Sequence, residues 1–164
     1  MSQDKKKSKS QAGGNTIIAR NKRARFDYFI EETMEAGIVL VGTEVKALRS
    51  GKASINECYA GEHEGEIFLY NAYIPEYSQA GGFFQHMTRR PRKLLLHKKE
   101  VGRLLGSIQK KGITLVPISL YFTPRGRVKV DLGIAKGKKQ HDKRQTEKNR
   151  DWSRDKSRLL REKN

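Results

Sequence analysis

The sequence has 164 residues, and its 35 Lys and Arg against 18 Asp and Glu give a formal net charge of +17. This length suits one domain with flanking tails. Apolar runs are short, none longer than five residues, which excludes a membrane-spanning helix. The charge predicts a polyanionic partner. Because no stretch has the wide apolar face of an interfacial helix, we expect nucleic acid and no membrane partner.

The charge is unevenly distributed and divides the chain into three parts. Residues 1–25 carry +7 and residues 137–164 carry +6, so the middle is close to an ordinary globular composition. We expect a disordered basic N-terminus over 1–15, a folded domain over 16–136 and a basic tail over 137–164. The N-terminus lacks the apolar core of a signal peptide, and one cysteine, Cys58, excludes an internal disulfide. Both features predict a cytoplasmic protein.

Six stretches have the alternation, or the β-branched and aromatic content, that is typical of strands. They span 16–19, 26–34, 38–41, 66–74, 113–122 and 128–134. Gly37 is interpreted as the turn of a hairpin between the second and the third. Pro117 predicts an edge or a bulge in the fifth, and TPRG over 123–126 predicts a turn before the sixth.

Helical signals are fewer. One candidate helix spans 43–50, with Thr43 as its N-cap, and another spans 95–111, with Gly112 as its C-cap. A third is a single turn around Cys58 and Tyr59, which Ser54 and Glu57 would cap. Residues 76–93 are expected to form a long loop, and long loops are usually functional or mobile. Strands without regular βαβ alternation predict a mainly β fold. We expect a small antiparallel β-barrel of the oligonucleotide-binding type with two or three inserted α-helices.

No pattern in the sequence predicts an enzyme, a metal site or a bound cofactor. The four histidines lie in separate segments, and none is at metal-ligand spacing from Cys58 or another histidine. Phosphate-binding loops, nucleophile elbows and paired carboxylate motifs are missing. The remaining catalytic alternative is a site assembled in space from Glu35, His86 or Asp131. We expect His97 to be a core or boundary residue of its helix, and Cys58 to be a packed residue.

Basic residues beside aromatic ones favour RNA as the partner. Arg23 and Arg25 precede Phe26 and Tyr28, and a basic cluster over 89–93 follows two phenylalanines. Cations bind phosphates, and aromatic rings can stack on unpaired bases. Each aromatic residue taken singly is expected to pack in the core, whereas the cations that follow the first strand are expected to be exposed.

The tail has the composition of a helix, but it has too few apolar residues to pack against a core. Opposite charges fall at helical spacings, as between Asp155 and Arg158, while the only strongly apolar residues are Trp152, Leu159 and Leu160. We predict a segment that is loose alone and becomes helical against a polyanion. The alternative is a solvated terminus without a role.

Three separate stretches resemble one known family. They are NKRARFDYFIEETMEAGIVLVGTEVKALRSGKASI (21–55), RKLLLHKKE (92–100) and VKVDLGIAKGKKQHDKRQTEKNRDWSRDKSRLLR (128–161). In this order they are similar to the SsrA-binding protein (small protein B) family of bacterial trans-translation. The resemblance implies an oligonucleotide-binding-type barrel that binds the tRNA-like domain of transfer-messenger RNA (tmRNA, or SsrA RNA). It also implies delivery of that RNA, with elongation factor Tu and GTP, to ribosomes stalled on mRNA without a stop codon.

The resemblance also implies which residues are functional. The implied tmRNA-binding positions are Asn21, Arg23, Glu35, Lys46, Tyr59, Leu95 and Lys129, to which we add the cations Lys22, Arg25, Lys52 and Lys136. The tail is similar to a segment that enters the empty mRNA channel and the small-subunit decoding centre, where it becomes helical on ribosomal RNA. Its expected ribosome-binding residues are Lys138, Lys139, His141, Asp142, Lys143, Arg144, Trp152, Lys156 and Arg158.

Binding of the tail there would allow ribosome rescue and peptide tagging. We expect a monomer that has no catalytic residues and needs no metal. Two other functions stay open at this point: a structural ribosomal or RNA-chaperone protein of the oligonucleotide-binding type, and a nuclease.

Overall fold

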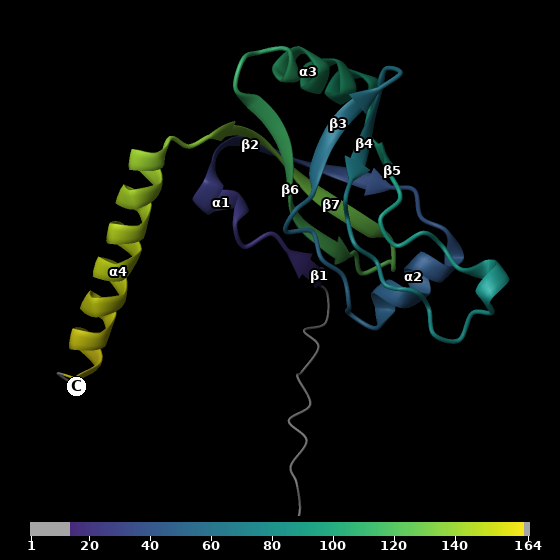
Figure 1. Ribbon diagram of the computed structural model, residues 1–164, viewed down its shortest axis with the longest axis horizontal. Coiled ribbons are helices and arrows are strands. Elements are labelled where there is room, and N and C mark those ends of the chain that lie inside the picture. Colours follow the sequence, from purple (N-terminus) through teal and green to yellow (C-terminus); the bar gives the residue numbers. More distant parts are fainter. Residues whose placement is uncertain (1–13, 163–164) are drawn as a thin grey trace, which may run out of the picture.

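Six antiparallel strands close into a ring around the core (Figure 1). The computed structural model describes residues 14–162, and its strands are β1 (Thr16–Arg20), β2 (Tyr28–Ile38), β3 (Tyr59–His63), β4 (Glu66–Tyr70), β5 (Arg92–Leu95), β6 (Ile113–Phe122) and β7 (Val128–Gly137). Their order is β1-β6-β3-β4-β5-β2-β7, and β6 also pairs with β7 to close the ring. The expected barrel is therefore confirmed. β1 lies outside the ring and pairs with the second half of β6.

Alternation along the strands places one set of apolar side chains inside the ring. Val130 and Leu132 of β7 are fully buried, as are Leu115 of β6 and Ile67 of β4. The helix α3 (Lys98–Ile108) lies over one end of the ring, at the top of Figure 1, and buries Leu104 against it. Each such side chain contributes about 1.5–3 kcal/mol on burial, so the apolar interior is the main source of the barrel's stability.

The bulge predicted at Pro117 and the turn predicted over 123–126 are both confirmed. The register between β6 and β7 shifts between Pro117 and Ser119, where proline lacks the N–H that a regular ladder needs. Gly112 after α3 and Gly126 between β6 and β7 have φ angles of +82° and +79°. L-residues with a side chain rarely adopt this conformation, so glycine is needed at both positions.

The predicted hairpin at Gly37 is wrong. β2 runs through Gly37, which pairs with Leu95 of β5 and with Lys129 of β7. A Cβ atom at this position would lie 3.1 Å from Cβ of Leu95, so the glycine permits a close approach of two strands instead of a turn. The strand ends at Ile38, and the expected strand over 38–41 leaves the sheet.

The helix predicted over 43–50 is present as α2 (Gly42–Arg49), but Thr43 is not its N-cap. The N-cap is Val41, whose backbone N–H donates to Oε2 of Glu44 at 2.9 Å. Thr43 lies in the first turn, with its Oγ1 2.9 Å from Nδ1 of His86. The glutamate that reaches back to the preceding backbone therefore sets the start of the helix.

The single helical turn predicted around Cys58 is absent from the described structure. Ser54 forms an isolated bridge with Tyr73, and Cys58 is buried, as expected. Tyr59 instead begins β3, a strand that the sequence did not predict because Gly61 and its polar neighbours have low β-propensity. β4 ends at Tyr70, before the predicted end, because Asn71 takes a left-handed conformation with φ of +63°.

The helix predicted over 95–111 is shorter than expected at both ends. β5 occupies Arg92–Leu95, and α3 ends at Ile108 with Gln109 as its C-cap, so the prediction of Gly112 as the C-cap is wrong. His97 is the exposed N-cap of α3, and its backbone N–H donates to Oε2 of Glu100 at 2.8 Å. The expectation that His97 lies at the core or its boundary is therefore wrong. The long loop before β5 is present and contains one short 3-10 helix, η1 (Gly82–Phe84).

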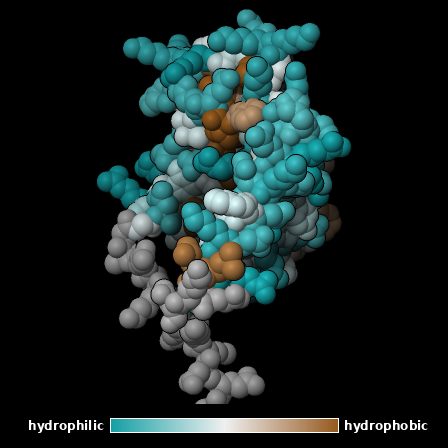
Figure 2. Space-filling model, turned by 90° about the vertical axis from the view of Figure 1, so that its left-hand side faces the viewer, coloured by the Kyte–Doolittle hydropathy of each residue, from teal (hydrophilic) through white to brown (hydrophobic). Residues whose placement is uncertain are grey.

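The tail is a single helix, α4 (Gln140–Glu162), that projects from the barrel (Figure 1). Its predicted helicity is confirmed, whereas ordering only on the ribosome stays a prediction. The side of the molecule from which α4 projects is largely hydrophilic (Figure 2). Within residues 14–162, no helix is long and apolar enough to cross a bilayer, and no three His, Cys, Asp or Glu side chains gather to hold a metal ion.

Candidate nucleic-acid interface

Several clefts lie on the described surface, and two of them contain predicted RNA-binding residues. The first of these two lies where β1 meets the short helix α1 (Ala24–Asp27). Its lining includes Arg20, Asn21, Lys22, Arg25, Ser119, Asp131 and Arg150. Asn21 is only 8% exposed, and its Oδ1 accepts the backbone N–H groups of Arg23 (3.2 Å) and Ala24 (3.1 Å). Asn21 therefore shapes the turn into α1. Lys22, Arg23 and Arg25 are exposed around it, as expected for cations that bind a polyanion.

The second cleft brings together two predicted site residues that are far apart in the sequence. Its lining includes Gly37, Ile38, Val45, Leu95, Arg127 and Lys129. β2 pairs with both β5 and β7, so Leu95 and Lys129 flank Gly37 from opposite sides. Leu95 is 53% exposed, which leaves an apolar surface beside a cation. Such a pair suits a nucleotide, whose sugar and base contact the apolar part while its phosphate contacts the lysine.

A chain of polar side chains on β2, β6 and β7 joins the two clefts. Nζ of Lys129 donates to Oε1 of Glu35, and the hydroxyl of Tyr121 donates to Oε2 of the same carboxylate. That hydroxyl also lies 3.3 Å from Oδ1 of Asp131, whose Oδ2 accepts the Ser119 hydroxyl at 2.6 Å. Ser119 and Asp131 line the first cleft and Lys129 lines the second. The predicted residue Glu35 therefore orients Lys129.

The ionisation of this chain follows from its hydrogen bonds. The bond from Lys129 and then the bond from Tyr121 hold the pKa of Glu35 below its ordinary value. Burial, followed by the bond to Glu35, raises the pKa of Tyr121 above its ordinary value. Near neutral pH, Glu35 is therefore a carboxylate and Tyr121 a neutral hydrogen-bond donor.

Six of the eleven predicted tmRNA-binding residues line neither cleft: Arg23 and Glu35, described above, and Lys46, Lys52, Tyr59 and Lys136. Lys46 is exposed on α2, with Nζ 5.6 Å from the centre of the Tyr77 ring. Tyr59 is 52% exposed and stacks on Tyr70 with ring centres 5.3 Å apart. Lys52 follows α2 and Lys136 lies near the far end of β7, and both are exposed. Their role in RNA binding stays a prediction.

The basic cluster over 89–93 is not the exposed RNA-binding cluster that the sequence suggested. Arg92 is fully buried, and its Nε donates to Oε1 of Glu44 at 2.8 Å. Arg90 donates to the same carboxylate from Nε (2.8 Å) and from Nη2 (2.7 Å). Both arginines therefore fasten the long loop to α2. Arg89 is exposed and lies over the Tyr73 ring.

The base of the tail contacts α1. Nζ of Lys143 lies 3.2 Å from Oδ1 of Asp27, and the Arg150 guanidinium lies 5.6 Å from the centre of the Phe26 ring. Lys138 precedes the helix, and its Nζ donates to the carbonyl of Arg25 at 2.9 Å. The tail therefore starts beside the first cleft, to which it contributes Arg150.

The other expected ribosome-binding residues show mostly local contacts. His141 lies 3.0 Å from a carboxylate oxygen of Asp142, and that carboxylate accepts the backbone N–H of Lys139 at the start of α4. Nζ of Lys156 lies 5.2 Å from the centre of the Trp152 ring, which is 66% exposed. Arg144 and Arg158 are also exposed.

Comparison with known proteins decides the family. The family model described as SmpB protein matches residues 18–162, which includes the barrel, both clefts and the tail. The chain belongs to the SmpB family.

Relatives in this family match the chain over nearly its whole length. It is 57% identical over 158 residues to the SsrA-binding protein of Rhodospirillum rubrum, covering 94% of this chain and 99% of that one. It is 60% identical over 147 residues to the SsrA-binding protein of Paramagnetospirillum magneticum, with 90% and 95% covered. A chain solved in "tmRNA-SmpB: a journey to the center of the bacterial ribosome" is 53% identical, with a TM-score of 0.62 over 74% of this chain and 84% of that one.

The sequence did not indicate several residues of this SmpB-family interface, including Arg20 and Ser119, which line the first cleft. Tyr121 and Asp27 were not singled out, and Arg150 was not assigned to the barrel's cleft. Asp27 follows the basic cluster by two residues, which was the available signal. Tyr121 gave no signal, because an aromatic residue in a strand usually packs in the core.

Proposed function

We propose that this SmpB-family chain is a monomeric RNA-binding adaptor of trans-translation. It binds the tRNA-like domain of tmRNA on its barrel and, with elongation factor Tu and GTP, delivers that RNA to stalled ribosomes. Its tail then occupies the empty mRNA channel and the decoding centre. The observation that carries the proposal is the family match over 18–162, and the two clefts that contain predicted RNA-binding residues are bordered by cations. Because ribosomes are its partners, we also propose a cytoplasmic location.

The barrel provides affinity through charge and shape more than through base-specific contacts. Lys22 and Arg25 line the first cleft, Arg23 is exposed between them in the sequence, and Lys129 with Leu95 borders the second cleft. Each lysine or arginine that neutralises a phosphate releases condensed counterions, which favours binding and makes it sensitive to salt. Hydrogen bonds fix Asn21 and Lys129 before RNA arrives, which lowers the entropy cost of binding.

The tail provides a test for an empty channel. It is a helix of 23 residues with exposed cations, and Trp152, Leu159 and Leu160 are all exposed. Fixing a backbone costs on the order of 1–2 kcal/mol per residue, so stable ordering of the whole tail requires many new contacts. Phosphates that line an unoccupied mRNA path supply such contacts. An mRNA already in the channel denies them.

The most direct test identifies the RNA that copurifies with the full chain. The adaptor proposal expects tmRNA, in amounts well below those of ribosomes in growing cells. A structural ribosomal protein would instead sediment with one ribosomal subunit at constant stoichiometry, and that result would overturn the proposal.

We further propose that the protein is not an enzyme. Glu35, His86 and Asp131, the residues of the catalytic alternative, do not form one site. His86 is buried, with Nε2 3.1 Å from the Ile74 carbonyl and Nδ1 near Thr43, whereas Glu35 and Asp131 flank Tyr121. Incubation of the pure chain with labelled RNA, with and without Mg²⁺, tests this. Cleavage that a single substitution in the chain abolishes would contradict the adaptor role.

A further inference from the structure

The carboxylate of Asp27 lies between the RNA-facing segment and the tail. Its Oδ2 is 3.5 Å from Nε of Arg23, and its Oδ1 is 3.2 Å from Nζ of Lys143. Arg23 is 71% exposed and free to meet RNA, whereas Asp27 and Lys143 are 23% and 31% exposed. One acidic side chain therefore serves two cations that belong to different functional parts of the molecule.

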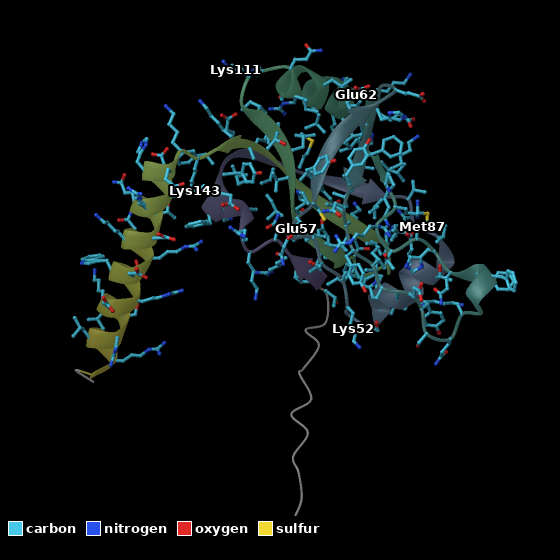
Figure 3. All side chains as sticks on the ribbon, viewed as in Figure 1. Lys52, Glu57, Glu62, Met87, Lys111 and Lys143 are labelled. Atoms are coloured by element: carbon cyan, nitrogen blue, oxygen red, sulfur yellow. The ribbon has the colours of Figure 1, made fainter. Side chains whose placement is uncertain are left out.

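Further contacts hold the base of the tail on α1 and keep Lys143 within reach of Asp27. The backbone N–H of Lys138 donates to the carbonyl of Asp27 at 2.9 Å, and its Nζ donates to the carbonyl of Arg25. Two helical turns beyond Lys143, Arg150 lies over Phe26 and lines the first cleft. Figure 3 shows Lys143 near the start of α4, where the helix comes beside α1. We name this set of contacts the tail seat.

An RNA phosphate at Arg23 changes the charge balance at the tail seat. The phosphate competes with Asp27 for Arg23, because charge-assisted bonds to phosphate are strong and Arg23 is exposed. Asp27 then pairs with Lys143 alone, and the negative charge of the phosphate offsets the repulsion between Arg23 and Lys143. Arg150, which lines the first cleft with Lys22 and Arg25, is attracted by the same negative charge.

We propose that Asp27 is a positioning residue that couples RNA binding on the barrel to firmer seating of the tail base. The inference rests on the proposed function, since it requires RNA at Arg23. By reciprocity, the seated tail strengthens RNA binding by the same factor. Because partly exposed ion pairs are modest, we expect a shift of about two- to fivefold in the ratio of seated to unseated tail. The tail thus gains a defined starting direction when its RNA is bound.

The experiment uses Trp152, the only tryptophan, as a reporter on the full chain. It measures the fluorescence anisotropy decay of Trp152 with and without an RNA fragment that comprises the tRNA-like domain of tmRNA. RNA binding is followed separately by the mobility of the labelled fragment. In the unaltered chain, RNA should increase the slowly decaying fraction, because the helix then moves more with the barrel. In Asp27→Asn and in Lys143→Gln this increase should disappear while the RNA still binds.

Two further variants separate coupling from a general structural effect. Asp151→Asn makes the same change in α4, where Asp151 lies 3.9 Å from the exposed Arg154, and should respond to RNA as the unaltered chain does. The double variant D27K/K143D restores an ion pair with reversed charges. It should regain the seating of the free chain but not the response to RNA, because Arg23 no longer has a carboxylate to share.

The outcomes distinguish the inference from the proposed function. If the fragment binds and Asp27→Asn shows the same increase as the unaltered chain, the coupling through Asp27 is overturned. The same holds if the RNA decreases the slowly decaying fraction. If the fragment does not bind the unaltered chain at all, the proposed function itself fails.

Discussion

Arg92 and Glu44 form an ion pair that is fully enclosed in the protein. Nε of the arginine lies 2.8 Å from Oε1 of the glutamate, and both side chains are 0% exposed. Nη1 of Arg92 donates to the carbonyl of Ala72 at 2.7 Å, and Arg90 supplies a second cation to Glu44. The pair joins β5 to the start of α2 and so fixes the end of the long loop. Burial of charge is tolerated here because the surrounding donors and acceptors satisfy it.

Glu44→Gln should therefore destabilise the protein strongly. The substitution leaves Arg92 buried without a counter-charge, and breaking such a pair typically costs about 3–5 kcal/mol. Urea denaturation measures the loss in the free energy of unfolding. Glu66→Gln is the matched control, because Glu66 pairs with Lys93 at the surface and its loss should cost under about 1 kcal/mol. Equal losses in the two variants would show that the buried pair is not important for stability.

Lowering the pH should reduce the free energy of unfolding of the unaltered chain more than that of the Glu44→Gln variant. Burial opposes ionisation of Glu44, but the bonds from Arg90 and Val41 and the charge of Arg92 outweigh it, so its pKa lies below the ordinary 4.5. A lowered folded-state pKa gives stability that is present above about pH 4.5 and lost as pH falls through the folded pKa. Denaturation midpoints between pH 7 and pH 3 test this. Parallel pH profiles for the two proteins would contradict it.

Tyr121→Phe should raise the pKa of Glu35 without restoring it fully. The substitution removes one of the two side-chain bonds that lower this pKa, while the larger effect, from Lys129, remains. Stability should fall by about 1–2 kcal/mol, since Glu35 is partly exposed and water replaces part of the lost bond. Carboxylate titration by NMR gives the pKa. Tyr70→Phe is the control, because the Tyr70 ring stacks on Tyr59 away from Glu35, and it should leave the pKa of Glu35 unchanged. If Tyr121→Phe also leaves this pKa unchanged, the proposed chain of hydrogen bonds is excluded.

Arg23→Gln should weaken binding of the tRNA-like RNA in a salt-dependent way. Removing one phosphate contact lowers the slope of log affinity against log salt concentration by about one. Arg103→Gln is the control, because Arg103 lies on α3 and pairs with Glu32 outside both clefts. The slope is obtained from affinities measured between about 50 and 200 mM salt, where the effect of counterion release on affinity is large. Identical slopes for Arg23→Gln and the unaltered chain would place the RNA elsewhere.

Local patterns in the sequence predicted most strands and the barrel correctly. The alternation of Val130 and Leu132 with polar neighbours identified β7, and Pro117 identified the bulge in β6. The charge spacing of the tail predicted α4. These features depend on neighbours within a few residues, which is the range over which periodicity and turn chemistry act.

What the sequence could not predict depends on partners distant along the chain. Gly37 suggests a turn until Leu95 is placed against it. Arg92 suggests an RNA contact until Glu44 is found beside it. Similarly, the second cleft arises only when β2 brings β5 and β7 together, so no local signal in the sequence joined Leu95 to Lys129. The family resemblance indicated both residues, and the structure supplied their proximity.

The central claim is that the barrel binds tmRNA while the tail acts on the ribosome, and a chain that ends at Gly137 tests it most directly. Its affinity for the tRNA-like RNA should stay within about fivefold of the full chain, the range allowed by coupling through the tail seat. Tagging of peptides on ribosomes stalled without a stop codon should be lost. A truncated chain that loses RNA affinity a hundredfold, or that still supports tagging, would contradict this division of roles.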